Sequence, residues 1–334
     1  MNGRIVIIFT IIRDPQMSNN QQLGAIGLDI GGTKIAAGIV LWPSGQILKK
    51  TILSTQPARG GEAVLKDTFN LANELYEFAR GEKIEVQGIG AGVAELVDCH
   101  GNVTSSCTID WSGRPIQEKL SEIVPAQIES DVRAAAIGEA VFGEGRGHPL
   151  FIYVTVGTGI SYCLMQDGQP FKGANGNAIT MASSPLTTEC THCGQKLRPV
   201  LEELASGPAI AKRFAQARGD KSSESCETVF QAALDGDQVA RKILTSAGEA
   251  LGVNVAFLVN VLDPGLIIVG GGLGTAGGMY WSAFEQSCRE HIFADNSRSL
   301  PIVTAKLGVN AGVVGAGAIV FAQQHSKENY VYEN

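Results

Sequence analysis

Residues 25–40, AIGLDIGGTKIAAGIV, form the pattern on which the fold depends: an apolar run, a glycine-rich turn and a second apolar run. A similar pattern recurs at residues 152–168, IYVTVGTGISYCLMQDG. In both copies a run rich in β-branched residues enters a Gly-Thr turn and leaves through another apolar run, which predicts a β-hairpin with a tight tip. Because the copies are separated by roughly the length of one domain, the sequence predicts two related halves that face one another.

The segments around these hairpins alternate between helical and extended patterns. Helices are predicted at about 62–80, 131–142, 199–217, 224–234, 237–260, 278–292 and 311–323, and strands at 84–90 and 266–269. This alternation predicts an α/β fold in which helices pack on largely parallel sheets.

Composition limits the classes of protein to be considered. The chain has 334 residues, of which 44% are hydrophobic and 18% charged, which is enough for two domains with their own cores. A formal charge of -7 argues against a nucleic-acid or membrane partner, because either would favour a basic face. We therefore expect a soluble protein that handles small molecules.

The cysteines and the N-terminus bear on the cellular compartment. The seven cysteines are an odd number scattered through the chain, which predicts reduced thiols and a cytoplasmic location. The apolar run at residues 5–12 is too short to cross a bilayer and lacks a small-residue cleavage site. Residues 1–22 are expected to be an extension, within which Met17 offers a second translation start.

The first Gly-Thr turn contains Asp29, Gly31, Gly32, Thr33 and Lys34. Adjacent glycines let backbone N–H groups converge on an anion, Thr33 adds a hydroxyl, and Asp29 can hold a metal ion through water. An ordinary hairpin turn explains the same residues, and for this turn alone it is the favoured interpretation.

The second Gly-Thr turn, which contains Thr155, Gly157, Thr158 and Gly159, changes that balance. Two such turns on opposing domains would hold a phosphate chain from two sides. A polyphosphate with Mg²⁺ is the kind of ligand that needs such a site.

A third glycine cluster, GGGLG at residues 270–274, follows an apolar strand directly. Open turns after a strand are where α/β proteins bind nucleotides. Gly272, Gly274 and Gly277 also satisfy GxGxxG, but a dinucleotide dehydrogenase is disfavoured because the motif does not open a βαβ unit. No GxxxxGK[ST] motif is present, which disfavours a P-loop enzyme.

The stretch IESDVRAAAIGE, residues 128–139, puts Asp131 in the first turn of an Ala-rich helix. Helix capping explains this pattern, with Ser130 at the N-cap and Asp131 favoured by the helix dipole. The functional alternative is a carboxylate in an interdomain cleft that accepts a hydroxyl proton during phosphoryl transfer. From the spacing alone, capping is favoured.

Together these motifs resemble those of the ROK sugar kinases, within the actin-like, hexokinase-type ATPase superfamily. The resemblance covers about residues 24–322 and rests on the order of LDIGGTK, ESDxxAAAIGE, YVTVGTGI, GANG, LEELASGPAI, NVLDPGLIIVGGGL and LGxxAGxxGAGAI. No helix-turn-helix segment precedes the first hairpin, which indicates the kinase branch and not the repressor branch.

The resemblance implies two actin-like (ribonuclease H-like) domains with a cleft between them. The small domain would comprise residues 23–130 with the helix at about 311–324, and the large domain residues 131–310. ATP and Mg²⁺ would lie between the domains, with the two Gly-Thr turns on the phosphates and Gly271 and Gly272 beside the nucleoside. Asp131 would be the catalytic base, and Glu202 would hold sugar hydroxyls.

The chain departs from the family in residues 173–193, GANGNAITMASSPLTTECTHC, which we call the acceptor loop. Thr180 stands where the family has a sugar-binding Glu, and Ser183 where it has a zinc-binding His. The family motif CxCGxxGCxE is altered too, with Cys190, His192 and Cys193 left as three conceivable ligands. Because neighbouring residues seldom point at one ion, zinc is not expected, and packing and hydrogen bonds would have to steady the loop.

Two other pocket positions differ from the family. Ser130 replaces an Asn beside the catalytic Asp, and Glu95 lies in GVAELVD where a Pro-Gly pair is frequent. Together with Thr180 these residues would change the hydrogen bonds offered to a substrate, and an unmatched buried polar group costs about 1–3 kcal/mol. Plain glucose is therefore not the expected substrate.

We predict an ATP-dependent carbohydrate kinase that phosphorylates a hydroxyl, in the first place the primary hydroxymethyl, of a hexose-like substrate. An amino sugar or a cyclitol fits, with Glu95 paired to an amine in the first case. The alternatives are a non-catalytic sugar or nucleotide sensor derived from such a kinase, and a nicotinamide enzyme. The sequence does not indicate the oligomeric state, although homodimers are common in this family.

Overall fold

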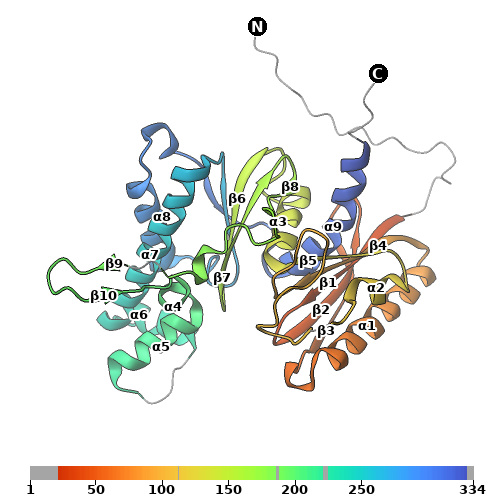
Figure 1. Cartoon of the computed structure of the whole chain (residues 1–334), viewed down its shortest axis with the longest axis horizontal. Coiled ribbons are helices and arrows are strands. Elements are labelled where there is room, and N and C mark those ends of the chain that lie inside the picture. Colours follow the sequence, from red (N-terminus) through yellow and green to blue (C-terminus); the bar gives the residue numbers. More distant parts are fainter. Residues whose placement is uncertain (1–21, 112, 186–187, 221–224, 329–334) are drawn as a thin grey trace, which may run out of the picture.

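The computed structural model describes residues 22–111, 113–185, 188–220 and 225–328 (Figure 1). Of the predicted extension at residues 1–22, only Gln22 lies within this range. Met17 therefore lies outside the described residues.

The first sheet is built around the first predicted hairpin. Its strands are β1 (Gln22–Ile30), β2 (Lys34–Leu41), β3 (Ile47–Ser54), β4 (Ile84–Val93) and β5 (Ala126–Ser130), in the order β3-β2-β1-β4-β5. β2 pairs antiparallel with β1 and β3, whereas β4 lies parallel to both β1 and β5. The carboxyl ends of β1, β4 and β5 therefore meet at one edge of the sheet.

The second sheet repeats this topology around the second hairpin. Its strands are β6 (Leu150–Val156), β7 (Ile160–Gln166), β8 (Gln169–Pro170), β11 (Ile267–Gly270) and β12 (Ile302–Thr304), in the order β12-β11-β6-β7-β8. Here too the hairpin continues into an antiparallel third strand, and two parallel strands follow on the other side. The prediction of two related halves, each with its hairpin, is confirmed by this shared strand order.

Helices form three layers around the two sheets (Figure 1). α1 (Gly61–Gly81) and α2 (Ile116–Ser121) cover one face of the first sheet, and α3 (Asp131–Phe142) and α9 (Ala311–Glu328) lie between the sheets. α4 (Glu202–Ala205), α5 (Gly207–Arg218), α6 (Cys226–Leu234), α7 (Gln238–Leu262) and α8 (Gly278–His291) form the layer beyond the second sheet. The α/β class is confirmed, although both sheets are mixed.

Smaller elements complete the described part of the chain. The 3₁₀ helices are η1 (Pro57–Arg59), η2 (Met181–Ser183), η3 (Asp295–Ser297) and η4 (Gly308–Asn310). A two-stranded ribbon, β9 (Thr188–Glu189) and β10 (Lys196–Leu197), stands apart from the two large sheets.

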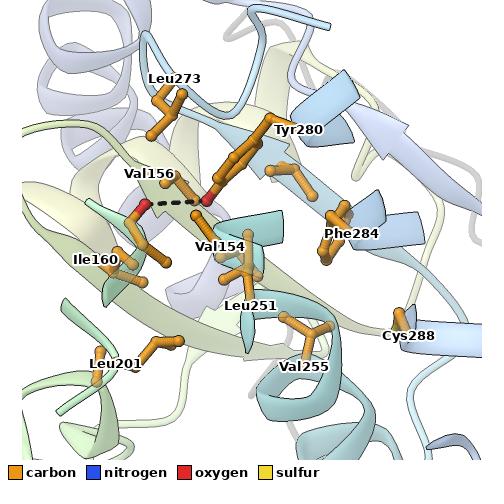
Figure 2. Close-up of a cluster of buried hydrophobic side chains, with 14 of the residues drawn as sticks. Val154, Val156, Ile160, Leu201, Leu251, Val255, Leu273, Tyr280, Phe284 and Cys288 are labelled. Atoms are coloured by element: carbon orange, nitrogen blue, oxygen red, sulfur yellow. Dashed lines mark hydrogen bonds between the residues drawn. The ribbon is translucent and has the colours of Figure 1, made fainter. Parts of the chain in front are cut away.

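The central strand of the second sheet is buried on both faces. Val154 and Val156 of β6 face the outer helices, where they pack near Tyr280 and Phe284 of α8 (Figure 2). Tyr153 points the other way, toward α3 and α9. Successive side chains of a strand alternate between faces, so one strand contributes to two cores and fixes the spacing of the layers.

The first sheet approaches α9 unusually closely because glycines face that helix. A Cβ atom on Gly27 would lie 2.1 Å from the carbonyl oxygen of Val313, and one on Gly90 would lie 1.8 Å from that of Ala316. No other residue type fits either position without a shift of backbone. These glycines set how close α9 can lie to the strands that carry the candidate site.

The single helix predicted at about 199–217 is wrong, because the structure divides it into α4 and α5. Ser206 between them is extended, with φ -75° and ψ 161°, and its side chain accepts a hydrogen bond from the N–H of Ala209. Pro208 follows in the first turn of α5, where its missing N–H costs nothing. The break lets Glu202 begin a helix of its own.

α7 is the one helix in the described ranges that is long and apolar enough to cross a membrane by length and composition. More than half of its most apolar window, 56%, is buried inside the protein. Residues such as Leu251 and Val255 contact the core of the second sheet (Figure 2), as the central helix of a globular layer does.

Candidate nucleotide and acceptor site

The carboxyl ends of three parallel strands bring the acidic candidates together. Asp29 of β1 is paired in register with Gly92 of β4, and Val93 is paired with Ser130 of β5. Asp131 follows directly as the first residue of α3. A Cβ atom on Gly92 would lie 3.5 Å from the Cα of Asp131, so the helix start is packed against β4.

The first Gly-Thr turn has a fixed backbone and open side chains. The N–H of Gly31 donates to the carbonyl of Lys34 at 3.0 Å, and the hydroxyl of Thr55 donates to the carbonyl of Gly31 at 2.6 Å. The N–H of Thr55 also donates to Thr33 O at 3.1 Å. Thr33 and Lys34 are exposed, so they can reach a ligand without losing internal contacts.

The second Gly-Thr turn and the third glycine cluster lie side by side. β11 and β6 are parallel, with Gly270 opposite Thr155. The N–H groups of Leu273 and Gly274 donate to the carbonyl of Val156 at 3.0 and 3.1 Å. Two segments that are far apart in sequence therefore form one continuous backbone surface.

At Gly271 the surface requires a glycine. At Gly157 and Gly272 the absence of a side chain leaves room for a ligand. Gly271 has φ +82°, and a Cβ atom there would lie 2.3 Å from the carbonyl of Val156. For Gly157 the nearest atom to a Cβ would be the nitrogen of Gly272 at 4.0 Å, and a Cβ on Gly272 would meet nothing within 4 Å. The surface is thus a backbone cradle that side chains do not fill.

Asp131 combines access to solvent with an environment that resists ionisation. Its side chain is exposed, and Oδ1 accepts a hydrogen bond from the N–H of Val132 at 2.7 Å. The protein that surrounds the carboxyl raises its pKa to about 6, and the charges of Asp29 and Glu95 act in the same direction. A carboxylate of this pKa is a stronger base than an ordinary Asp and is still ionised at neutral pH.

Asp29 lies deeper than Asp131 at the same edge. Burial raises its pKa, against the opposing effect of Lys34 and Lys50. A Cβ atom on Gly312, at the start of α9, would lie 2.2 Å from Oδ2 of Asp29. The carboxylate is therefore held between its own hairpin and α9.

Ser130 occupies the N-cap of α3 as predicted, but its side chain does not make the capping hydrogen bond. Its backbone is extended and the residue is 7% exposed. The expected N-cap position of Ser130 is therefore correct, but the expected hydrogen bond from its side chain to the helix is not formed. That its hydroxyl contacts a substrate stays a prediction.

Glu95 has a different environment from the one predicted. Oε1 accepts hydrogen bonds from the N–H groups of Thr108 and Ile109 at 2.6 and 2.9 Å, and Oε2 accepts from the N–H of Cys107 at 2.9 Å and from the Ser105 hydroxyl. Burial alone would raise the pKa of Glu95, but these hydrogen bonds lower it below its usual value. A carboxylate with four donors of its own loop argues against the predicted pairing with a substrate amine.

Glu202, the first residue of α4, lies against the second Gly-Thr turn. Its Oε2 accepts a hydrogen bond from the N–H of Ile160 at 2.9 Å. The same oxygen would lie 2.8 Å from a Cβ atom on Gly159. Glu202 therefore braces the turn predicted to hold phosphate, while its predicted contact with sugar hydroxyls stays a prediction.

In the acceptor loop, the residue before Thr180 has a strained backbone. Ile179 has φ +61°, a conformation that β-branched residues adopt only when their surroundings force it. Thr180 follows it and is exposed, with a long hydrogen bond of 3.4 Å from its hydroxyl to the carbonyl of Asn177. Ser183 is exposed as well.

The three conceivable zinc ligands lie in the β9–β10 ribbon. The N–H groups of Cys193 and His192 donate to the sulfur of Cys190, and these contacts lower the pKa of that thiol. Within the described ranges, no group of three or more His, Cys, Asp or Glu side chains is arranged to hold a metal ion. The arrangement does not fit a tetrahedral zinc site, which needs four ligands.

A buried ion pair beside the site was not predicted from the sequence. Arg133 Nε lies 2.5 Å from Glu129 Oε1, and their side chains are 7% and 4% exposed. The signal was present in ESDVR, where an acid precedes an arginine by four residues across a strand-to-helix junction. Such spacing usually marks an exposed helix pair, which is why its burial could not be foreseen.

The site fits a nucleotide with Mg²⁺ in its donor chemistry. The backbone cradle beside Gly157 and Gly272 has room for a ligand, and exposed Thr33, Lys34 and Thr158 add hydroxyl and ammonium donors. Mg²⁺ needs only one or two carboxylates besides water and phosphate oxygens, and Asp29 offers one. That the two Gly-Thr turns act on one phosphate chain stays a prediction.

The fold and the site define a two-domain α/β protein of the actin-like class. The chain belongs to the ROK family, whose model matches residues 25–323. A glucokinase of Streptomyces coelicolor is 30% identical to it over 87% of this chain and 95% of that protein.

A solved structure and a regulator extend the comparison. A ROK family glucokinase from Streptomyces griseus, crystallised in complex with glucose and AMPPNP, has a TM-score of 0.73 and 29% identity over 89% of this chain and 98% of that one. A xylose repressor of Caldicellulosiruptor bescii is 26% identical over 93% of this chain and 82% of that protein. The family therefore includes both kinases and a regulator at similar identity.

Proposed function

We propose that this chain is an ATP-dependent carbohydrate kinase that transfers a phosphoryl group to the primary hydroxyl of a hexose-like substrate. The observation that carries the proposal is the Asp131 carboxylate, which is exposed, has a pKa raised to about 6, and lies at the strand edge that also bears Asp29. Glucokinase relatives with this fold support the same reaction class.

In this proposal each group of the site has a separate task. Asp131 accepts the proton of the substrate hydroxyl as that oxygen bonds to the γ-phosphorus, while the bond from the γ-phosphorus to the β–γ bridging oxygen breaks and ADP leaves. Thr33, Lys34 and the backbone of the second Gly-Thr turn would hold the phosphates, and Asp29 would hold Mg²⁺. Bound ATP·Mg²⁺ supplies the phosphoryl group and neutralises negative charge on the phosphates.

The acceptor is proposed to differ from plain glucose. Thr180 offers one hydroxyl where the family has a carboxylate, so the acceptor loop presents one negative charge fewer to the substrate. Because Glu95 is used inside its own loop, it no longer favours an amino sugar over a neutral hexose or a cyclitol. The hydroxymethyl group remains the common requirement.

A panel assay tests this proposal directly. The purified protein is given ATP and Mg²⁺ with hexoses, amino sugars and cyclitols, ADP release is measured, and ³¹P NMR identifies the phosphorylated hydroxyl. We expect turnover with at least one compound that bears a hydroxymethyl group.

The alternative function is a non-catalytic sensor, which the altered acceptor loop and the xylose repressor relative favour. Binding of a sugar in calorimetry without ADP release across the whole panel would support the sensor and contradict the kinase.

A further inference from the structure

A cluster of three charges lies between the candidate base and the acceptor loop, with Glu129 and Arg133 buried and Lys172 partly exposed. Glu129 ends β5 with Ser130, and Arg133 stands two residues after Asp131 on α3. Besides the Arg133 contact, Glu129 Oε2 lies 2.7 Å from Nζ of Lys172, which immediately precedes the acceptor loop. An isolated buried charge is costly, so such a cluster persists only when its members are paired and hydrogen-bonded.

The remaining nitrogens of Arg133 bind backbone oxygens of two further segments. Nη1 donates to the carbonyl of Gly176 in the acceptor loop, and Nη2 donates to the carbonyl of Val97 after β4, both at 2.5 Å. One planar guanidinium therefore joins β5, the segment after β4 and the acceptor loop. A lysine has a single nitrogen and cannot reproduce this three-way geometry.

The acceptor loop is packed onto this anchor at backbone distance. Gly176 has φ +78°, and a Cβ atom there would lie 2.3 Å from the carbonyl of Val97 and 2.6 Å from the Cα of Asp98. The thiol of Cys99 also contacts the carbonyl of Gly173 at 3.3 Å. These contacts cross from the second half of the chain to the first half, next to Asp131.

We propose that Arg133 is a positioning residue that fixes the acceptor loop relative to Asp131, with Lys172 and Glu129 as its support. The proposal rests on the kinase function proposed above and deepens it. Because Arg133 and Asp131 share the first turn of α3, the guanidinium ties the base and the loop that bears Thr180 to one rigid element. The strained backbone of Ile179 lies three residues beyond the Gly176 contact, in a segment that this anchor holds.

The test compares two arginines that each pair with a glutamate four residues earlier and donate to two backbone carbonyls. Arg289 also pairs with a glutamate four residues earlier, Glu285, and donates to the carbonyls of Arg298 and Leu300, but it lies on α8 away from the site. We expect Arg133→Lys to raise KM for the acceptor by at least about tenfold while KM for ATP changes by less than about twofold, and Arg289→Lys to change neither.

A second variant and a second readout keep the test independent of folding and of activity. Lys172 is partly exposed, so Lys172→Met should fold, and it removes only the link between the loop and Glu129. Hydrogen exchange of peptides that cover residues 172–185 should become faster in both Arg133→Lys and Lys172→Met, and should stay at the wild-type rate in Arg289→Lys.

The outcomes separate this inference from the proposed function. Faster exchange of the loop in both variants, with a selective rise in acceptor KM, supports the positioning role. Unchanged exchange, or equal changes in the two KM values, overturns it even if the wild type is an active kinase. If the wild type phosphorylates nothing, the kinase proposal fails, whereas the exchange measurement still decides whether Arg133 holds the loop.

Discussion

At the scale of single residues, two features of Asp131 have opposite effects on the pKa of its carboxyl group. It starts a helix, where the dipole favours a negative charge, and yet the surrounding protein raises its pKa to about 6. The second effect dominates because the surrounding protein desolvates the ionised carboxylate, and the like charges of Asp29 and Glu95 add to this rise in pKa.

Replacing Asp131 by Asn tests this interpretation. We expect Asp131→Asn to lower kcat by about 10²- to 10⁴-fold, because the proton acceptor is lost, while ATP affinity stays nearly unchanged. In the wild type, kcat/KM should fall as the pH drops below about 6, where the base becomes protonated. Steady-state kinetics from pH 5 to pH 9, together with calorimetric titration of ATP, would reveal retained turnover and so refute the assignment.

The raised pKa also predicts an effect on stability. Because the folded state disfavours the ionised form, the wild type loses stability as the pH rises from the usual carboxyl pKa of 3.8 to about 6. Asp131→Asn should therefore have a higher free energy of unfolding than the wild type above pH 6, and the gain should vanish below pH 4. Denaturant titrations at the two pH values measure this difference.

At the scale of elements, the segment after β4 is organised by one carboxylate. Glu95 binds residues 105–109 through four hydrogen bonds, and Thr108 of that segment reaches the first Gly-Thr turn. A Cβ atom on Gly32 would lie 2.4 Å from Cγ2 of Thr108. Glu95 therefore acts on the site indirectly, by fixing the loop that packs against the first Gly-Thr turn.

Glu95→Gln tests this loop-organising role. Replacing one oxygen by NH₂ puts a donor against N–H donors, so we expect a loss of about 1–3 kcal/mol in the free energy of unfolding at neutral pH. Since the hydrogen bonds lower the pKa of Glu95, its contribution is complete above the usual carboxyl pKa of 4.5 and disappears as the pH falls below that value. Chemical denaturation at pH 7 and pH 3.5 compares the two.

The same variant separates this role from contact with a substrate amine. An amino sugar and its neutral analogue should lose affinity equally, because the effect acts through the loop. A selective loss of the amino sugar would restore the original prediction that Glu95 binds an amine.

At the scale of the whole molecule, α3 and α9 join the two halves. A Cβ atom on Gly315 of α9 would lie 2.3 Å from the carbonyl of Ala134 on α3, and Gly315 Cα would lie 2.8 Å from a Cβ atom on Gly138. The helix that begins with Asp131 is thus packed at backbone distance against the helix that covers the first sheet. Because Asp131 begins α3, a change in this contact should also affect the site.

Gly315→Ala is expected to destabilise the molecule by about 1–3 kcal/mol, because the added methyl group forces two helix backbones apart. Gly81→Ala is the matched control, since Gly81 also lies in a helix but a Cβ atom there meets nothing within 4 Å. We expect the control to be neutral or slightly more stable. Urea denaturation of both variants is decisive, and an equal effect of the two would contradict the close-contact interpretation.

Local patterns were sufficient for much of the fold. Both hairpins, the helices at α1, α3, α7 and α8 and the strand β11 agree with the prediction, because alternation and helical periodicity are properties of neighbouring residues. The strands β3, β5 and β12 were not predicted. β3 is an edge strand with exposed Leu48 and Ile52, and β12 has only three residues, so neither carries the apolar signal of a central strand.

Some residues of the candidate site could likewise be predicted from the sequence, and others could not. The glycine turns and Asp131 could be selected from the sequence because turn chemistry and helix starts have local signatures. The role of Glu95, the Lys172–Glu129 pair and the contact of Arg133 with the acceptor loop could not, because they depend on partners 10 to 43 residues away that only the folded chain brings near.

By itself, the sequence determined the two hairpins, the alternation of helices and strands, and the types of residue available for phosphate and proton chemistry. Only the tertiary structure decided which of these residues meet. The first sheet brings Asp29 and Asp131 to one edge, and the buried guanidinium of Arg133 donates a hydrogen bond to Gly176 of the acceptor loop. The reason is physical: local conformation depends on neighbouring residues, whereas burial, pKa and hydrogen-bond partners depend on atoms that other parts of the chain supply.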